Sequence, residues 1–550
     1  MQDNSLNKMT RRDFLKFLTS GALMLGLGTA VSRFGSLPGS GVNTGLLQAA
    51  ASSSGINFWS RGINLLSTPI HAAVLPNGKI LYITGSGEAP TQAAGPYLAG
   101  ILDPITNTQT KLTVAEDIFC GGNCLLPSGN VLFTGGTLAY GDPSTFQSYE
   151  GLSSAYEFDF TSNSFVKKNS MAHGRWYPTQ VALPNGTVLI ISGLDELGCT
   201  NHLVEIYDPA TQSFSISYDP LSGRTYTVGY CNTGADPGSP TYGGTKKGTS
   251  PGISLYPRMH LMPNGLVANV GMSQPLKTWN PSTGHWVIGG QFAIYQNRTF
   301  GTSVLLPLQN SPTETGKILV IGGAPNRSYP ATNTCEIVTP NGDSLQTQFT
   351  APTQYPRIYL NATILPTGSI FVNGGTTQGG ASSYSVYAAE LFDPTSQTWS
   401  TMPSATISRR YHSVALLLPD GRVWTAGTTL GLQPPGDLTT EIFSPAYVTG
   451  TRPTISSDPI IQGGYGGSII IPTPDAAHIS AVSLVSVSSV THHHSSEQRL
   501  IWLQIQSRAS DILTVAAPIN SNLAPAGYYM IHVLDDNSTP SIAKFIKIPS

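Results

Sequence analysis

The chain has 550 residues, of which 11% are charged, and a formal net charge of −2. Soluble domains usually contain about 25% charged residues, whereas this sequence holds 58 glycines and 41 prolines, which leaves little material for long amphipathic helices. The near-neutral charge and the lack of a basic run argue against a nucleic-acid partner. The length allows a large core and more than one domain.

Residues 1–50 have the features of an export signal. Arg11 and Arg12 precede the apolar stretch "FLTSGALMLGLGTAV", and small residues follow near Ala50. This order is that of a twin-arginine signal peptide. The apolar stretch is shorter than the roughly 20 residues of a spanning helix. We therefore expect export by the twin-arginine machinery to the periplasm, cell surface or exterior, and no membrane contact after signal removal.

Residues 51–447 contain one repeat seven times. Each copy has an apolar run, a turn and a second apolar run that ends in Gly, as in "YPTQVALPNGTVLIISG" from Tyr177. Such a copy predicts a β-hairpin. A second turn signal, such as "YDPATQSF" from Tyr207, follows most copies and raises the count to four strands per repeat. The spacing is close to the kelch period of about 50 residues. We predict an all-β fold in this region, a seven-bladed kelch-type β-propeller.

One position of the repeat carries reactive side chains. The residue seven places before each turn proline is, in chain order, Pro69, Cys120, Tyr177, Tyr256, Phe300, Tyr359 and His412. Blades arranged around an axis would bring these side chains face to face, and a metal centre could be assembled there. Tyr411 precedes His412, and neighbours in a strand point to opposite faces. Both can contact one ion only if the backbone bends at the start of the strand.

Residues 448–550 lack the repeat. Short segments of alternating apolar and polar residues, such as "GYYMIHVLDD" from Gly527, predict an immunoglobulin-like β-sandwich. Between two of the predicted strands lie His492, His493 and His494. Imidazole is a preferred ligand of copper and zinc, and a loop of one domain can insert into another. A polar surface loop is the alternative interpretation.

The five cysteines carry information if the protein is exported. In an oxidising compartment an odd number leaves one cysteine without a disulfide partner. Cys120, at the reactive repeat position, is the predicted one. Cys199 and Cys231 lie near the longest gap between repeats, and we expect a disulfide between them.

Four motifs resemble one known family. They are "FCGG" from Phe119, "GRWYPT" from Gly174, "RRYHSVALLLPDGRV" from Arg409 and "VTHHHSSEQRL" from Val490. The order of these motifs, the repeats in which they lie and the β-sandwich that follows them resemble those of the radical copper oxidases, the galactose oxidase and glyoxal oxidase family. The likeness runs from about Ile56 to the end. The carbohydrate-binding domain that precedes the propeller in galactose oxidase has no room here, so the layout is closer to glyoxal oxidase.

The resemblance implies a role for each matching residue. Cys120 would be joined by a thioether to Tyr177, which would bind copper and hold a radical. Tyr411 would be the axial ligand that accepts the hydroxyl proton of the substrate. His412 would be one imidazole ligand and His492 the other, because a threonine precedes His492 and a Gln-Arg pair follows it. The next two histidines remain alternatives.

The implied reaction oxidises a primary alcohol or a hydrated aldehyde with O2 to a carbonyl or acid product and H2O2. One copper ion stores one electron, so the cross-linked phenol would store the second oxidising equivalent. Two imidazoles and two phenols suit a tetragonal Cu(II) site. A small molecule is the expected substrate, and polysaccharide ends are a further candidate.

One departure and two alternatives stay open. In galactose oxidase a tryptophan from the loop after the third repeat stacks over the thioether, but here that loop reads "SGLDELGCTNH", with Asp195 near the place. No stacking residue is therefore assigned. A non-catalytic secreted kelch-propeller binding protein is the main alternative function. A zinc hydrolase is disfavoured because phenols are poor zinc ligands.

Overall fold

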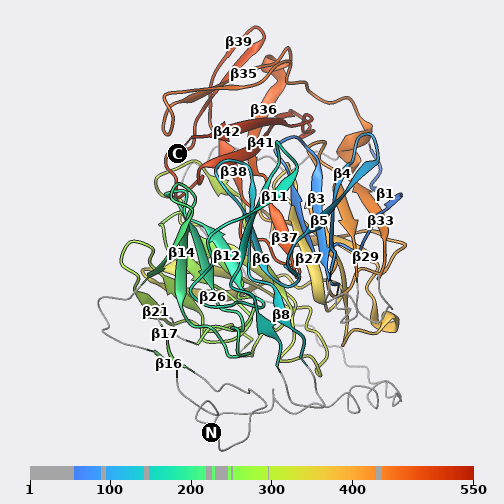
Figure 1. Cartoon of the computed structure of the whole chain (residues 1–550). Helices are drawn as coiled ribbons and strands as arrows, with labels where there is room; N and C mark the ends of the chain where they lie inside the picture. The colour runs from blue at the N-terminus through green and yellow to red at the C-terminus, as the bar shows by residue number, and fades with distance from the viewer. Residues whose placement is uncertain are drawn as a thin grey trace, which may run out of the picture.

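The computed structural model describes residues 55–87, 95–141, 148–217, 226–228, 246–248, 252–294, 296–428 and 436–549. The predicted signal at residues 1–50 lies outside these ranges. The described part consists of strands with three short 3-10 helices, η3 (Ser382–Tyr384), η4 (Ala446–Thr449) and η5 (Ala476–His478). No helix in these ranges is long and apolar enough to cross a membrane. The prediction of an all-β protein with a C-terminal β domain is confirmed (Figure 1).

Antiparallel four-strand units make up the larger body. The first has β2 (His71–Val74), β3 (Ile80–Gly85), β4 (Tyr97–Asp103) and β5 (Thr108–Val114); the second has β6 (Gly122–Leu125), β7 (Val131–Thr134), β10 (Ala155–Asp159) and β11 (Ser164–Lys167); the third has β12 (Thr179–Ala182), β13 (Val188–Ile191), β14 (Val204–Asp208) and β15 (Ser213–Ser217). Each runs in chain order from its first to its fourth strand, as hairpin repeats require.

Four further sheets follow the same pattern. The fourth has β18 (Met259–Leu261), β19 (Val267–Asn269), β20 (Lys277–Trp279) and β21 (Trp286–Ile288); the fifth has β22 (Thr302–Leu305), β24 (Ile318–Ile321), β25 (Cys335–Asn341) and β26 (Ser344–Thr350); the sixth has β27 (Ile358–Ile364), β28 (Ile370–Thr376), β29 (Ala388–Asp393) and β30 (Thr398–Ser404); the seventh has β31 (Val414–Leu417), β32 (Val423–Ala426), β33 (Thr439–Ser444) and β1 (Phe58–Asn64). In the seventh sheet, β1 pairs with β33 and ties the start of the repeat region to its end.

The Pro-x-Gly turns have the backbone that the sequence requires. Gly78 and Gly186, for example, have φ of 78° and 83°. Only glycine reaches this left-handed region without steric cost, so each tight turn needs it. The hairpins of the repeats are therefore fixed locally by the sequence.

The C-terminal domain consists of two sheets. One has β34 (Ile460–Gln462), β35 (Ser468–Pro472), β40 (Ile512–Ala516) and β39 (Ile505–Ala509); the other has β38 (Leu500–Leu503), β36 (Ile479–Ser486), β41 (Gly527–Asp535) and β42 (Lys544–Ile548), joined by β23 (Leu308–Gln309) of the larger body. One hydrophobic core includes Val482 and Val515 of this domain and Val320 of the fifth sheet. Figure 1 shows these strands in orange and red above the larger body, while β37 (Ser489–Thr491) reaches down into it.

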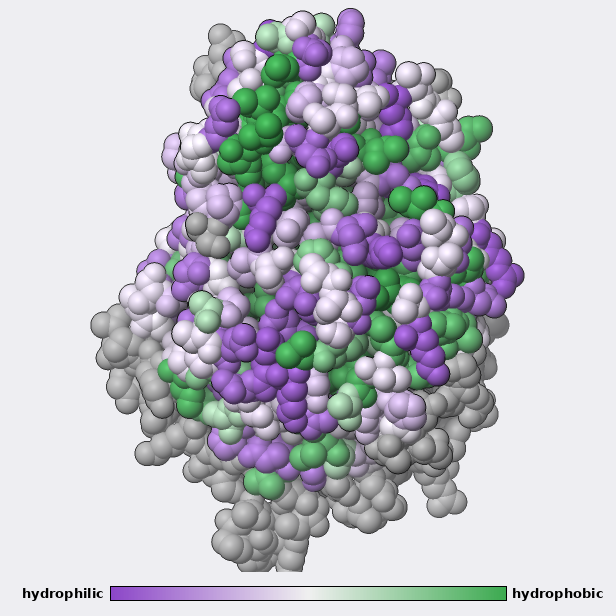
Figure 2. All heavy atoms as spheres, turned by 45° about the horizontal axis from the view of Figure 1, so that its top comes forward, coloured by the Kyte–Doolittle hydropathy of each residue, from purple (hydrophilic) through white to green (hydrophobic). Residues whose placement is uncertain are grey.

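Short two-stranded ribbons complete the fold. They pair β8 (Thr137–Ala139) with β9 (Glu150–Gly151), and β16 (Tyr226–Val228) with β17 (Lys246–Gly248). The face that carries the C-terminal domain has polar and apolar side chains intermixed (Figure 2). This mixture agrees with a sequence that contains few charged residues.

A buried arginine–glutamate pair recurs in the sheets. The pairs and their N–O distances are Arg175–Glu205 (2.6 Å), Arg298–Glu336 (2.5 Å), Arg357–Glu390 (2.6 Å) and Arg409–Glu441 (3.8 Å). All eight side chains are at most 1% exposed. Arg357 also donates to the carbonyl of Gly374 at 2.7 Å. Three of these arginines lie two residues before a reactive repeat position, so the pairs fix the chain where it enters an inner strand.

Removing one partner of such a pair should be costly. Arg357→Met leaves the Glu390 carboxylate buried without its counter-ion, and we expect a loss of about 3–5 kcal/mol in the free energy of unfolding. Lys167→Met at the more exposed Lys167–Glu116 pair is the control, with an expected loss below about 1 kcal/mol. Denaturant unfolding measures both. The double variant Arg357→Met/Glu390→Leu should recover part of the loss, and equal losses for Arg357→Met and Lys167→Met would contradict the interpretation.

Candidate metal centre

The reactive repeat position has a left-handed backbone in six of its seven copies. The φ angles are 61° at Cys120, 69° at Tyr177, 42° at Tyr256, 59° at Phe300, 62° at Tyr359 and 66° at His412. Each non-glycine residue in this region costs about 1–2 kcal/mol. The bend that was predicted for Tyr411 and His412 is confirmed, because their rings stack at 4.0 Å instead of pointing to opposite faces.

Backbone hydrogen bonds join neighbouring copies of this position. The amide of Tyr177 donates to the carbonyl of Cys120 at 2.8 Å, and the amide of Tyr256 donates to the carbonyl of Tyr177 at 2.9 Å. The amide of Tyr359 donates in the same way to Phe300 at 2.9 Å. These bonds hold equivalent residues of adjacent sheets next to each other.

The five residues predicted for the site lie together. The ligand atoms of Cys120, His412 and His492 are all within 4.8 Å of one another, and the three side chains are buried. Cys120 Sγ is 3.6 Å from His492 Nε2. The hydroxyls of Tyr177 and Tyr411 contact each other, and the Tyr177 ring lies 4.7 Å from the His492 ring. The second, third and seventh sheets and the C-terminal domain each contribute to this cluster.

The histidine loop enters the larger body beside the first sheet. Strand β37 pairs with β2, which places Thr491 opposite His71. The Thr491 hydroxyl lies 2.7 Å from His492 Nδ1, so Nε2 is left to face the cluster. All three histidines are buried. The alternative interpretation of a polar surface loop is therefore wrong.

The other two histidines have different partners. His493 Nε2 lies 3.0 Å from the carbonyl of Arg410. His494 Nε2 accepts a hydrogen bond from the Met259 amide at 3.3 Å. Each of the three rings thus has its own direction, and His492 is the one that joins Cys120 and His412.

Two side chains that the sequence analysis did not single out hold this loop. The buried Arg258 donates from Nη2 to the His492 carbonyl at 3.1 Å. Glu497 accepts hydrogen bonds from the Ser489 hydroxyl and the Leu125 amide, both at 2.5 Å. Burial raises the pKa of Glu497 to about 7, although these hydrogen bonds lower it. The sequence could have indicated Arg258, because it lies two residues after Tyr256 at the reactive repeat position.

Burial keeps the imidazoles neutral. It lowers the pKa values of His412 and His492 well below their ordinary range, and neighbouring histidines lower them further. His71 lies close by, with its ring 6.2 Å from that of His492 and its Nδ1 3.1 Å from Asn123 Oδ1. Burial lowers the pKa of His71 to about 4. Neutral imidazoles present the lone pair that a metal ion requires.

Aromatic side chains surround the two tyrosines. The Trp176 ring lies 3.7 Å from the Tyr177 ring, and Tyr149 stacks on Trp176 at 4.3 Å. The Tyr256 ring lies 4.4 Å from the Tyr177 ring, and the Tyr256 hydroxyl donates to the Gly121 carbonyl at 2.7 Å. The repeat-position residues without an assigned role thus form part of the wall.

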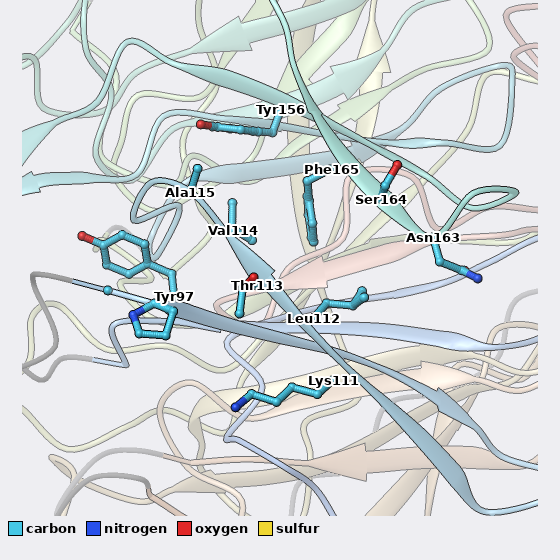
Figure 3. A pocket seen from close by; sticks show the side chains of 12 residues that line it. Tyr97, Lys111, Leu112, Thr113, Val114, Ala115, Tyr156, Asn163, Ser164 and Phe165 are labelled. Carbon is cyan, nitrogen blue, oxygen red and sulfur yellow. The ribbon is translucent and has the colours of Figure 1, made fainter.

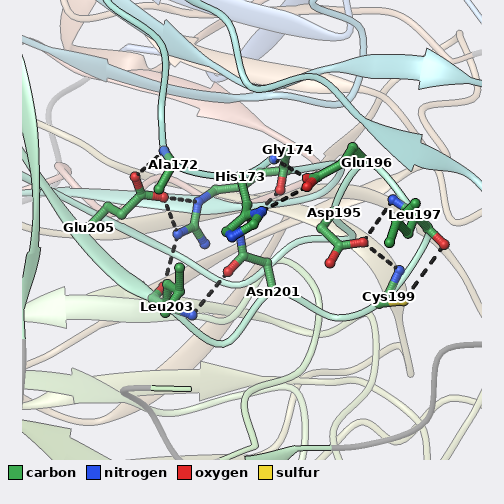
Figure 4. Close-up of polar contacts among 11 residues, drawn as sticks. Ala172, His173, Gly174, Asp195, Glu196, Leu197, Cys199, Asn201, Leu203 and Glu205 are labelled. Atoms are coloured by element: carbon green, nitrogen blue, oxygen red, sulfur yellow. Dashed lines mark hydrogen bonds and ion pairs between the residues drawn. The ribbon is translucent and has the colours of Figure 1, made fainter. Parts of the chain in front are cut away.

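Asp195, near the place of the missing tryptophan, has hydrogen-bond partners within its own loop. Its carboxylate accepts hydrogen bonds from the amides of Leu197 and Cys199, both at 2.9 Å, and closes its own loop (Figure 4). Trp176, which directly precedes Tyr177, lies over the ring instead. Sequence reasoning missed Trp176 because neighbours in a strand normally face opposite sides.

The cysteines agree with the expectations in part. Cys199 is disulfide-bonded, and its predicted partner Cys231 lies outside the described residues. Cys120, Cys124 and Cys335 are buried thiols. The prediction that Cys120 is in no disulfide is confirmed. The expectation that one cysteine alone stays outside disulfides is wrong, because Cys124 and Cys335 are buried in separate sheets.

A surface cavity of about 820 Å³ lies between the outer strands of the first and second sheets (Figure 3). Tyr97, Lys111, Tyr156 and Phe165 are among its lining residues. No residue of the cluster lines it. The cavity therefore does not belong to the candidate metal centre.

Two family models match this chain. Residues 247–447 match the glyoxal oxidase N-terminus, and residues 452–548 match the galactose oxidase-like early set domain. Together they cover more than half of the chain.

Relatives that match most of the chain support the same assignment. A galactose oxidase of Gibberella zeae is 26% identical over 526 residues, which cover 90% of this chain and 71% of that protein. The aldehyde oxidase GLOX of Vitis pseudoreticulata is 26% identical over 492 residues, which cover 82% of this chain and 85% of that protein. A solved structure described as a novel fungal alcohol oxidase of the AA5 family in complex with copper has the same fold, with a TM-score of 0.74 at 23% identity over 90% of this chain and 100% of that chain. The chain therefore belongs to the galactose oxidase and glyoxal oxidase family.

Proposed function

We propose that this protein is a mononuclear copper radical oxidase that oxidises a primary alcohol or an aldehyde with O2 and forms H2O2. The observation that carries the proposal is one cluster that brings together Cys120, Tyr177, Tyr411, His412 and His492. A non-catalytic binding function would not require a buried thiol beside two neutral imidazoles and two phenols that contact each other. The membership in a family of oxidases supports the same function.

The donor set suits copper. Tyr177, Tyr411, His412 and His492 would hold one ion, and two imidazole nitrogens with two phenol oxygens fit the tetragonal preference of Cu(II). The contact of His492 Nδ1 with the Thr491 hydroxyl leaves Nε2 available to a metal ion and supports its role as a ligand. When bound, copper supplies one oxidising equivalent and stabilises the phenolate form of its tyrosines.

The second oxidising equivalent would reside on Tyr177. We infer that a thioether joins Cys120 Sγ to the Tyr177 ring. Its formation removes the thiol hydrogen and one ring hydrogen, and the two electrons and two protons pass to O2 as H2O2. The Tyr177 amide, hydrogen-bonded to the Cys120 carbonyl, holds the two residues together.

Tyr411 is the proposed base. It is 5% exposed, stacked on His412, and in contact with the hydroxyl of Tyr177. In the overall reaction RCH2OH and O2 give RCHO and H2O2, so two electrons and two protons leave the alcohol. The phenolate oxygen of Tyr411 would take the hydroxyl proton. Tyr177 is half-buried, so the substrate would reach the site next to the Tyr177 side chain.

We infer further that the seven sheets are blades of a kelch-type propeller spanning residues 51–447, and that residues 448–550 form an immunoglobulin-like sandwich. The uniform strand order of the sheets and the pairing of β1 with β33 support this architecture. O2 and a small alcohol or aldehyde are the proposed partners, with polysaccharide ends as a second substrate class. Twin-arginine export of the chain, with its signal at residues 1–50, remains part of the proposal.

The cross-link has a direct test. After copper loading in air, peptides bearing Cys120 and Tyr177 should appear as one linked species that is two hydrogens lighter than the sum of the two. Peroxide should form with at least one substrate from a set of small alcohols and aldehydes. The Cys120→Ser variant should lose the link and nearly all activity, while Cys335→Ser, which removes a buried thiol of the fifth sheet, should keep both. Unlinked peptides together with no peroxide would overturn the proposal.

The role of Trp176 has a spectroscopic test. If its ring shields the Tyr177 radical, Trp176→Leu should shorten the lifetime of the radical signal by roughly tenfold, whereas Trp176→Phe should retain most of it, because an offset aromatic contact is worth about 0.5–1.5 kcal/mol. The Cu(II) electron paramagnetic resonance spectrum of the one-electron reduced form should be the same in both variants. A radical lifetime unchanged in Trp176→Leu would reject this role.

A further inference from the structure

An exposed arginine lies beside the proposed base. The loop between β24 and β25 carries Arg327, whose guanidinium carbon is 5.5 Å from the Tyr411 ring centroid and 4.9 Å from that of Phe300. Tyr411 is buried, whereas Arg327 is exposed. Arg327 is therefore accessible to a substrate that approaches the hydroxyls of Tyr411 and of the half-buried Tyr177, which are in contact.

The wall of the site anchors this arginine. Besides the Phe300 and Tyr411 rings, the Tyr359 side chain hydrogen-bonds to Arg327. Phe300 and Tyr359 both have the left-handed backbone of the reactive repeat position. Contacts with three rings order the guanidinium in advance, which lowers the entropic cost of using it in binding.

The electrostatic surroundings of Tyr411 are positive. The buried Arg258 also acts on Tyr411 through its charge. The buried glutamates of the fifth, sixth and seventh sheets are each paired with an arginine, in the pairs Arg298–Glu336, Arg357–Glu390 and Arg409–Glu441. A positive field at the entrance of a site raises the local concentration of anions and their association rate.

We infer that Arg327 is a specificity-determining residue that binds the carboxylate of an acidic substrate. The guanidinium fork matches a carboxylate in a bidentate arrangement. Because the guanidinium carbon of Arg327 is 5.5 Å from the Tyr411 ring centroid, a substrate that contacts both groups must be short. The substrate class is thus short aldehyde acids and hydroxy acids. This inference rests on the proposed oxidase function.

Glyoxylate is the smallest probe of this class. Its hydrate reacts as (HO)2CH–COO⁻ + O2 → HOOC–COO⁻ + H2O2. The C–H bond and one O–H bond are broken, the carbon is oxidised by two electrons, and both electrons and both protons pass to O2. Glyoxal has the same reacting group without the charge and serves as the neutral comparison.

The kinetic test uses the full copper-loaded chain with both probes. The unsubstituted enzyme should have a kcat/KM for glyoxylate at least about tenfold above that for glyoxal. Arg327→Gln should raise the KM for glyoxylate by roughly tenfold to a hundredfold, the range expected for a lost charge-assisted contact. The kcat for glyoxylate and both constants for glyoxal should change by less than about threefold. Arg327→Lys should restore part of the effect, and Arg61→Gln, an exposed arginine on β1, should have none.

Calorimetry separates this inference from the oxidase function. Oxamate, an unreactive carboxylate analogue, should bind the copper-loaded protein, and Arg327→Gln should weaken that binding by the same factor as the KM. If Arg327→Gln changes neither oxamate binding nor the glyoxylate KM while both probes are oxidised, the inference is wrong and the oxidase function stands. If no probe is oxidised but oxamate binding depends on Arg327, the anion site stands and the oxidase function fails.

Discussion

The left-handed backbone at the start of the inner strands is the constraint on which this site depends. Alternation along a strand would send neighbouring side chains to opposite faces, whereas the turn at His412 stacks its ring on Tyr411 at 4.0 Å. Each such residue costs about 1–2 kcal/mol. Amide-to-carbonyl hydrogen bonds between equivalent positions, such as Tyr177 to Cys120, and buried arginine–glutamate pairs just before the strands hold the chain in this conformation. The left-handed backbone that the repeats share at this position thus brings the side chains of Cys120, Tyr177 and His412 to one site.

A loop from the C-terminal domain completes the cluster, so the site requires both parts of the chain. Strand β37 pairs with β2, and Arg258 and Glu497 hold the segment that carries His492. Removing these groups from water keeps the histidines neutral and ready to bind a cation. The buried Arg258 donates hydrogen bonds to the carbonyls of Gly301 and His492, and neither acceptor is a carboxylate. An anionic phenolate nearby would compensate the charge of Arg258.

The sequence alone could identify Cys120, Tyr177 and His412 because one repeat register aligns them, and the strand periodicity predicted the hairpins. The choice of His492 needed the family resemblance, since its identity depends on separate partners for three adjacent rings. Trp176 could not be found, because alternation places it away from Tyr177 and only the bend at φ 69° brings the rings to 3.7 Å. Arg327 lies in a loop whose path no repeat pattern predicts.

The central claim is that one copper ion joins ligands from separate sheets and from the C-terminal loop. Anomalous diffraction from copper-loaded crystals, recorded above and below the copper absorption edge, tests it most directly. The account predicts one strong difference peak per chain, bounded by Tyr177 Oη, Tyr411 Oη, His412 and His492 Nε2, that disappears in His492→Ala and persists in His493→Ala. A peak elsewhere, or one that survives His492→Ala unchanged, would contradict it.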